Sequence, residues 1–87
     1  MALLPPKVIA QVSSRSTGEL GVMSWEWIMR ADGQVSYRLT KVNGRRERNP
    51  WIPATRLPAA ELEAIRGDEA KATEMLAVIA RQQGHRR

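Results

Sequence analysis

The side chains best suited to chemistry in this sequence are arginines and lysines gathered in one short stretch. Residues 38–56 carry six basic side chains and one acid, Glu47. Basic groups at this density attract polyanions through Coulomb forces and the release of counterions. We predict a nucleic-acid-binding surface of seven residues: Arg38, Lys41, Arg45, Arg46, Arg48, Trp51 and Arg56. The basic ones would contact phosphates, and Trp51 or an arginine would add specificity. The alternative is a solvated surface that keeps the protein in solution.

Residues able to catalyse a reaction are scarce and isolated. The sequence has no cysteine, and its one histidine is His85, in the basic tail 85–87. The carboxylates Glu61 and Glu63 are two residues apart, so they do not share a helix face. The hydroxyl residues of 13–17 have no base to activate them. We therefore expect no enzymatic activity, no cofactor and no metal site.

The length and charge distribution indicate one domain, residues 1–87, with two unlike parts. The β-rich part, 7–57, is basic, because residues 1–57 hold nine Lys/Arg and four Asp/Glu. The part with helical spacing is 58–84, and from residue 58 onward there are five of each sign. No apolar run approaches the roughly 20 residues of a membrane span, and the N-terminus lacks a signal-peptide pattern. We expect a cytoplasmic protein with no membrane partner.

Residues 24–42 predict a β-hairpin that turns at Asp32-Gly33. A two-residue loop would place Trp27 opposite Arg38 and mix polar and apolar residues on both faces. A three-residue loop, 31–33, instead gives the pairs Trp25–Leu39, Trp27–Tyr37, Met29–Val35 and Glu26–Arg38. One face is then apolar and the other polar, and burial of each large side chain is worth about 1.5–3 kcal/mol. We predict the three-residue loop, with Gly33 left-handed and the aromatic residues in the core.

The remaining strands have weaker signals. Residues 7–12 alternate as a strand, 13–18 are predicted as a polar loop with Arg15 in solvent, and 19–23 are extended through Leu20 and Val22. Asn43-Gly44 marks a second tight turn. The prolines at 50 and 53 restrict the strand after it to a sheet edge or a very short segment. Trp51 either caps the core or lies beside Arg38.

From Pro58 the spacing predicts two helices. Pro58 suits the first position of a short helix, and Leu62 and Ile65 face inward. Gly67 ends that helix and Asp68 caps a second one, from about Glu69 to Gln83, with Gly84 as its stop. The inward face of the second helix comprises Ala72, Met75, Leu76, Ile79 and Gln83. Val78 widens this stripe, either for core packing or for a homodimer through the C-terminal helix.

Together these elements predict an α+β fold: a small antiparallel sheet or SH3-like barrel of four to five strands, followed by one short and one longer C-terminal α-helix. Tyr37-Arg38-Leu39, Asn43-Gly44 and the segment 51–57 resemble the closing strands of SH3-like and Tudor-like barrels, over residues 7–57. That resemblance implies binding of a peptide, a nucleic acid or another protein.

The chain also resembles three-stranded sheets backed by a helix, as in integrase arm-binding and AP2-like domains. That resemblance implies contacts with a DNA groove from Arg30, Arg38, Arg46, Arg48 and Trp51. Two functions follow from the sequence. The first is a nucleic-acid-binding domain, for duplex DNA through a basic β-face. The alternative is a small phage or mobile-element module that binds proteins and inhibits or adapts a larger complex.

Overall fold

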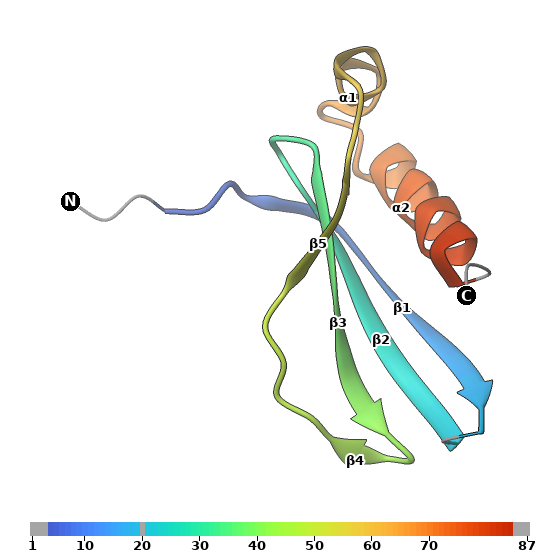
Figure 1. Cartoon of the computed structure of the whole chain (residues 1–87). Helices are drawn as coiled ribbons and strands as arrows, with labels where there is room; N and C mark the ends of the chain where they lie inside the picture. The colour runs from blue at the N-terminus through green and yellow to red at the C-terminus, as the bar shows by residue number, and fades with distance from the viewer. Residues whose placement is uncertain (1–3, 20, 85–87) are drawn as a thin grey trace.

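An open antiparallel sheet with one helix on a face and a short helix at its end makes up the chain in a computed structural model, which describes residues 4–19 and 21–84 (Figure 1). The strands are β1 (Val8–Gly18), β2 (Gly21–Arg30), β3 (Gln34–Val42), β4 (Arg45–Arg46) and β5 (Ile52–Arg56). The helices are α1 (Ala59–Ile65) and α2 (Glu69–Gly84). The predicted α+β class, with a short and a longer C-terminal helix, is confirmed. Leu20 and the tail with His85 lie outside the described residues.

The β2–β3 hairpin has the predicted three-residue loop. Trp27 lies opposite Tyr37, Glu26 opposite Arg38, and the other two predicted pairs also form. Gly33 has a φ of 90°, which an L side chain rarely adopts, and its N–H donates to the carbonyl of Arg30 at 2.9 Å. Trp27 is buried and stacks on half-buried Tyr37, with 4.9 Å between ring centroids. The aromatic residues therefore belong to the core side of the sheet.

Strand β1 is longer than predicted, because residues 13–18 continue it rather than forming a loop. Ser14 lies opposite Trp25 on β2 and Ser16 opposite Met23, so Ser14 is the diagonal neighbour of Trp27 and Ser16 that of Trp25. The two indole Nε1–H groups donate to the serine hydroxyls, each at 3.0 Å. A serine at every second position therefore satisfies the polar edge of a partly buried tryptophan. The polar composition of this segment reflects that pairing, and Arg15 is exposed as expected.

The sheet does not close into an SH3-like barrel. Strand β4 pairs with the end of β3 and β5 with its beginning, so both lie along the same side of β3 (Figure 1). β1 pairs with β2, and β5 does not reach it. The expectation for the proline-containing strand is confirmed, since β5 is a five-residue edge strand that includes Pro53.

Helix α2 covers one face of the sheet, α1 lies beside it at the end of the sheet, and both helices contribute to the core (Figure 1). α1 begins at Ala59, one residue later than predicted, with Pro58 at the cap and Ile65 buried. The Asp68 carboxylate accepts the N–H of Lys71 at 3.1 Å and so caps α2, as predicted. Among residues 69–82 of α2, the buried side chains are Ala72 and Leu76, as predicted, and Ala80, which was not predicted.

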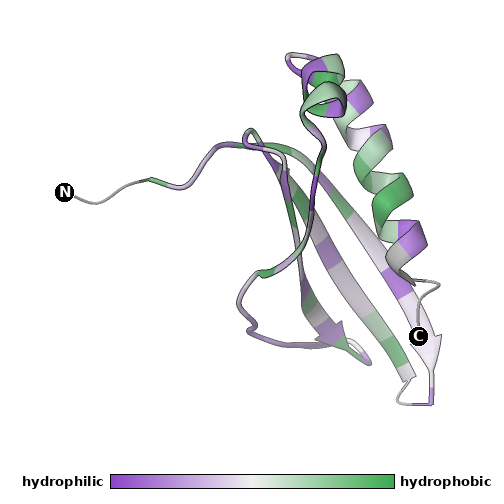
Figure 2. Cartoon of the chain, turned by 45° about the horizontal axis from the view of Figure 1, so that its top comes forward, coloured by the Kyte–Doolittle hydropathy of each residue, from purple (hydrophilic) through white to green (hydrophobic). Residues whose placement is uncertain are grey.

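Helix α2 packs mainly over β1, where the small residues Ala10 and Val12 allow a close approach. Figure 2 shows apolar and polar residues interleaved along it. Val78 is 46% exposed, half a helical turn away from buried Leu76, so contact with a second chain there stays a prediction. The Gln83 side chain lies outside what the structure describes. Within residues 4–19 and 21–84, no helix has the length and hydropathy needed to cross a membrane.

Candidate nucleic-acid interface

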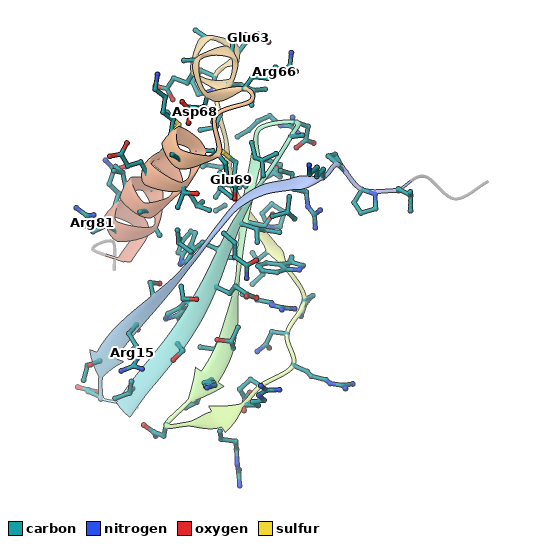
Figure 3. The ribbon with its side chains drawn as sticks, turned by 180° about the vertical axis from the view of Figure 1, so that it is seen from behind. Arg15, Glu63, Arg66, Asp68, Glu69 and Arg81 are labelled. Atoms are coloured by element: carbon teal, nitrogen blue, oxygen red, sulfur yellow. The ribbon has the colours of Figure 1, made fainter. Side chains whose placement is uncertain are left out.

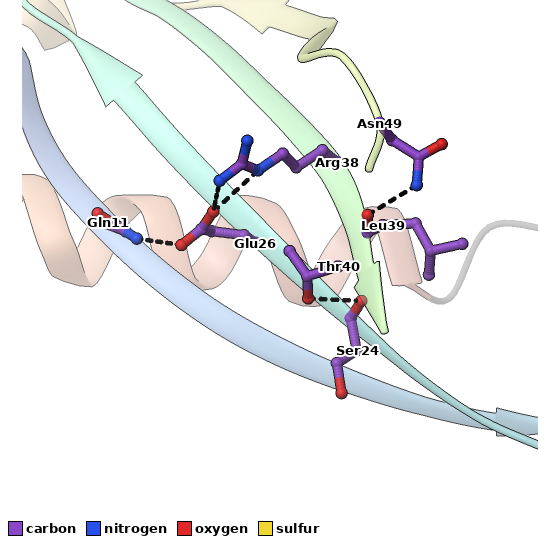
Figure 4. A network of polar contacts seen from close by, with 7 residues as sticks. All are labelled: Gln11, Ser24, Glu26, Arg38, Leu39, Thr40 and Asn49. Carbon is purple, nitrogen blue, oxygen red and sulfur yellow. Dashed lines mark hydrogen bonds and ion pairs between the residues drawn. The ribbon is translucent and has the colours of Figure 1, made fainter. Parts of the chain in front are cut away.

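The face of the sheet that the helices leave uncovered, here called the open face, holds Arg38 in a fixed position. Its Nη2 and Nε donate to Oε1 of Glu26 at 2.8 and 3.0 Å (Figure 4). The other oxygen of Glu26 accepts from the Gln11 amide. The Arg38 guanidinium also lies 4.2 Å from the ring centroid of Trp51. Of the two alternatives for Trp51, the position beside Arg38 is the one observed.

The chain between β4 and β5 is tied to β3, and this places Trp51. The Asn49 side-chain amide donates to the carbonyl of Leu39 at 2.9 Å (Figure 4). Two residues earlier, the N–H of Glu47 donates to the carbonyl of Thr40 at 2.9 Å. The segment therefore follows β3 beyond the end of β4, and the Trp51 ring meets the guanidinium of Arg38.

A row of basic side chains crosses the open face near the tips of the hairpins. Arg15 of β1 is paired with Ser24 of β2, Ser24 with Lys41 of β3, and Lys41 with Arg46 of β4. Directly paired residues share a face of a sheet, and Ser24 shares the face of Glu26 and Arg38. Lys41 joins this face, although it is three residues from Arg38, because the β2–β3 register shifts at Thr40. From Arg15 to Arg46 the row spans three strand spacings, about 14 Å. We call Arg15, Lys41 and Arg46 the basic row.

The basic row has no internal charge compensation. All three side chains are exposed, and none has an ion-pair partner within the part of the chain that the structure describes. Lys41 lies directly opposite Arg46, and like charges so placed destabilise a sheet. An anion held between them would remove that repulsion. The helical part, 58–84, has the opposite balance, with five acidic and three basic residues.

Two more of the predicted residues lie near this row. Arg45 and Arg48 are exposed at β4 and just after it. Arg45 is paired with Val42, so its side chain starts from the other face of the sheet at this narrow tip. The structure therefore brings Arg45 and Arg48 to the same end of the molecule as Lys41 and Arg46.

Two arginines proposed from the sequence lie at the other end of the sheet. Arg56 is paired with Gln34 at the start of β3, donates to the Asp32 carbonyl at 3.2 Å, and has its Nη2 3.8 Å from the Asp32 carboxylate. Arg30, a position suggested by the sheet-and-helix resemblance, donates to the carbonyl of Pro6 at 2.8 Å. Neither joins the basic row. Arg15 does join it, a position that was not predicted because residues 13–18 were expected to form a loop.

The turn at Asn43-Gly44 links the two hairpin tips that carry the row. Both residues have positive φ, 51° and 82°, the type I′ turn that Asn-Gly favours. The Asn43 side chain accepts the N–H of Val22 at 2.9 Å, and the Asn43 N–H donates to the carbonyl of Val22 at 2.7 Å. The start of β2 is thereby fastened to the β3–β4 turn.

The charged residues do not form a metal centre: across residues 4–19 and 21–84, no three His, Cys, Asp or Glu side chains are grouped to hold an ion. A cleft of about 530 Å³ lies between the start of β1 and the corner joining α1 to α2. Comparisons with protein-family models, with curated proteins and with solved structures found no match.

Proposed function

We propose that this chain is a non-enzymatic nucleic-acid-binding domain that holds duplex DNA against the basic row of its open face. The observation that carries the proposal is the set of three exposed, uncompensated basic side chains aligned across four strands. Arginine and lysine contacts of this kind neutralise phosphates and release counterions. Arg45 and Arg48, at the same end, would extend the contact along the phosphate backbone.

The aromatic residues favour a duplex over a single strand. Binding of unpaired bases uses exposed rings on which successive bases stack. The chain has three tryptophans, one tyrosine and no phenylalanine. Trp25, Trp27 and Tyr37 pack on the helix side of the sheet, and Arg38 covers one side of the Trp51 ring. At most one ring surface is left for stacking, so phosphate contacts would supply most of the affinity.

The test is a fluorescence-anisotropy titration with duplex DNA, single-stranded DNA and RNA of one sequence, at low and at physiological salt. We expect the tightest binding to the duplex and a steep loss of affinity with salt. The variant Arg46→Glu with Arg48→Glu should abolish that binding. The control, Arg66→Glu with Lys71→Glu, makes the same change in net charge in the helical part and should bind nearly as the wild type does. Equal losses in both variants would contradict a localised interface.

The cleft beside β1 favours a second candidate, a protein-interaction module such as a phage or mobile-element protein that blocks a larger complex. Apolar side chains of Val8, Leu62 and Ile65 line the cleft, and Val8 is 37% exposed. Under this function Val8→Asp would abolish activity, whereas Arg46→Glu with Arg48→Glu would leave it unchanged. The two variants therefore separate the two candidates in any assay of biological activity.

A further inference from the structure

The outer edge of β1 is a long row of backbone groups that no other strand uses. β1 has 11 residues, and within the described chain it pairs only with β2. Along its outer side, alternate residues direct N–H and C=O groups away from the sheet, as in any edge strand. Such an edge readily adds a further strand.

The two sides of the sheet differ in how they prevent such pairing. On the β3 side the edge is broken into two short strands, of two and five residues, and it contains Pro53. Short strands and prolines are the usual protection against edge-to-edge association. β1 has no proline, and its only charged side chain is Arg15, in its second half. The chain protects one edge and leaves the other suited to pairing.

β1 is complementary to a second copy of itself. β1 has an irregularity between Val8 and Ala10, so an antiparallel pairing centred on Ser13 uses the regular part of the strand, residues 10–16, and places Gln11 opposite Arg15 of the second copy. Residues at equal distances from the centre point to the same face, so polar residues meet polar ones on the open face. On the helix face, Val12 would meet Ser14, a contact between small side chains.

The charges also fit this pairing. Arg15 has no ion-pair partner among residues 4–19 and 21–84, whereas Glu26 lies next to Gln11 on the same face. In the paired arrangement, β1 of one copy and β2 of the other are two strand spacings apart. Glu26 is displaced along β2 by two residues from the position level with Arg15 of the other copy. The Cα atoms of Arg15 and Glu26 are therefore about 12 Å apart. Their long side chains together cover that distance. The two Arg15 residues are about 14 Å apart, so they do not repel each other strongly.

We propose that two copies of the chain associate through β1, antiparallel about Ser13, into one continuous sheet. The helices of both copies would then lie on the same side and run in opposite directions. The Glu69 end of one α2 would lie toward the Arg81 end of the other, which is a favourable arrangement of charge (Figure 3). The open faces would merge, and each copy's basic row would continue into the other's.

The consequence for binding rests on the function proposed above. Arg15 ends the basic row at the β1 edge of a single chain, but it lies near the centre of the merged face in the dimer. Each DNA molecule would then contact two basic rows. Linking two binding surfaces raises the overall affinity without any new kind of contact.

The test uses the absence of native cysteine. In the proposed register Ser13 faces its own copy with Cα atoms about 4.5–5.5 Å apart, within the range of a disulfide. Ser13→Cys should therefore cross-link under mild oxidation without nucleic acid present. Thr17→Cys is the matched control, since Thr17 is also exposed on β1, but its two copies would be about 27 Å apart. We expect disulfide-linked dimer in most of the first variant and little of the second.

Equilibrium sedimentation of the wild type should give twice the 9.8 kDa of one chain. Equal cross-linking of the two variants, or a wild type that sediments as a single chain at high concentration, would overturn the dimer. Anisotropy with duplex DNA then compares the cross-linked and reduced forms of Ser13→Cys. A dimer that binds no DNA would refute the proposed function and leave the association standing. DNA binding by a chain that stays monomeric would refute the proposed association and leave the proposed function standing.

Discussion

Replacing Lys41 by glutamate should stabilise the fold while weakening its binding to DNA. Lys41 is directly paired with Arg46, so the substitution turns a like-charge pair into an opposite-charge pair. Cross-strand pairs are worth roughly 0.2–1 kcal/mol. For a domain of this size, that range corresponds to a rise in Tm of about 1–8 °C. Both side chains are exposed, so the increase should shrink at high salt.

The same substitution removes one phosphate contact from the basic row. Each contact contributes about 0.9 to the slope of log K against log salt concentration for duplex DNA. We expect the slope for Lys41→Glu to fall by about 1 or more, because the glutamate also repels phosphate. The slope is measured by anisotropy over a series of salt concentrations, and Tm by circular dichroism at low salt.

A matched substitution tests whether position, rather than net charge, decides the outcome. Lys71→Glu makes the same change of charge on the exposed side of α2. It should leave the salt slope unchanged within error. If Lys41→Glu lowers Tm, or binds DNA with the wild-type slope, the reasoning from the basic row is wrong.

Further predictions concern the core, the hairpin loop and the fixed arginine. Leu76→Ala should lower the free energy of unfolding by about 2–5 kcal/mol in urea, and Val78→Ala by less than about 0.5, since Leu76 is fully buried and Val78 is not. Gly33→Ala should cost about 1 kcal/mol or more by the same measurement, because φ is 90°. Glu26→Gln weakens the ion pair with Arg38 and should lower the free energy of unfolding by about 1 kcal/mol or less. It should also tighten DNA binding in low-salt anisotropy, because the open face loses the negative charge of Glu26.

The hairpin register could be predicted because only one loop length separates polar from apolar residues. Shifting the β2–β3 pairing by one residue would place Trp27 opposite Arg38 and mix polar and apolar side chains on both faces. The burial of large side chains outweighs any preference of the turn itself. The structure has the predicted pairs in each case. An alternation of polar and apolar residues is thus enough to predict the register of a hairpin in which both strands carry large apolar residues.

The second half of β1 could not be predicted from its own composition. Serine is common in turns, and a run with Ser13, Ser14 and Ser16 has no apolar alternation. The partners of Ser14 and Ser16 are indole groups on another strand, a relation that sequence position does not show. The useful signal was the spacing of two residues between these serines, which matches that between Trp25 and Trp27.

The residues of the candidate site were predicted because they lie close together in the sequence. The errors in that prediction arise because closeness in sequence does not always mean closeness in space. Lys41, Arg45, Arg46 and Arg48 come together because a tight turn keeps them near one another. Arg56 follows them closely in sequence, but β5 returns along the first half of β3 and carries it to the far end of the sheet. Arg15 is distant in sequence and adjacent in space.

The bond between Asn43 and Val22 has a consequence for the entropy of binding. Two neighbouring hairpin tips would ordinarily fray independently, and a ligand that spans them would have to order both. Here the Asn43 side chain and backbone tie them together, so that Arg15, Lys41 and Arg46 stand on backbone that is already ordered before any anion arrives. Binding then has to restrict only the rotamers of the long side chains. The amide protons of Val22 and Asn43 should accordingly exchange with solvent together, through one shared opening of both tips.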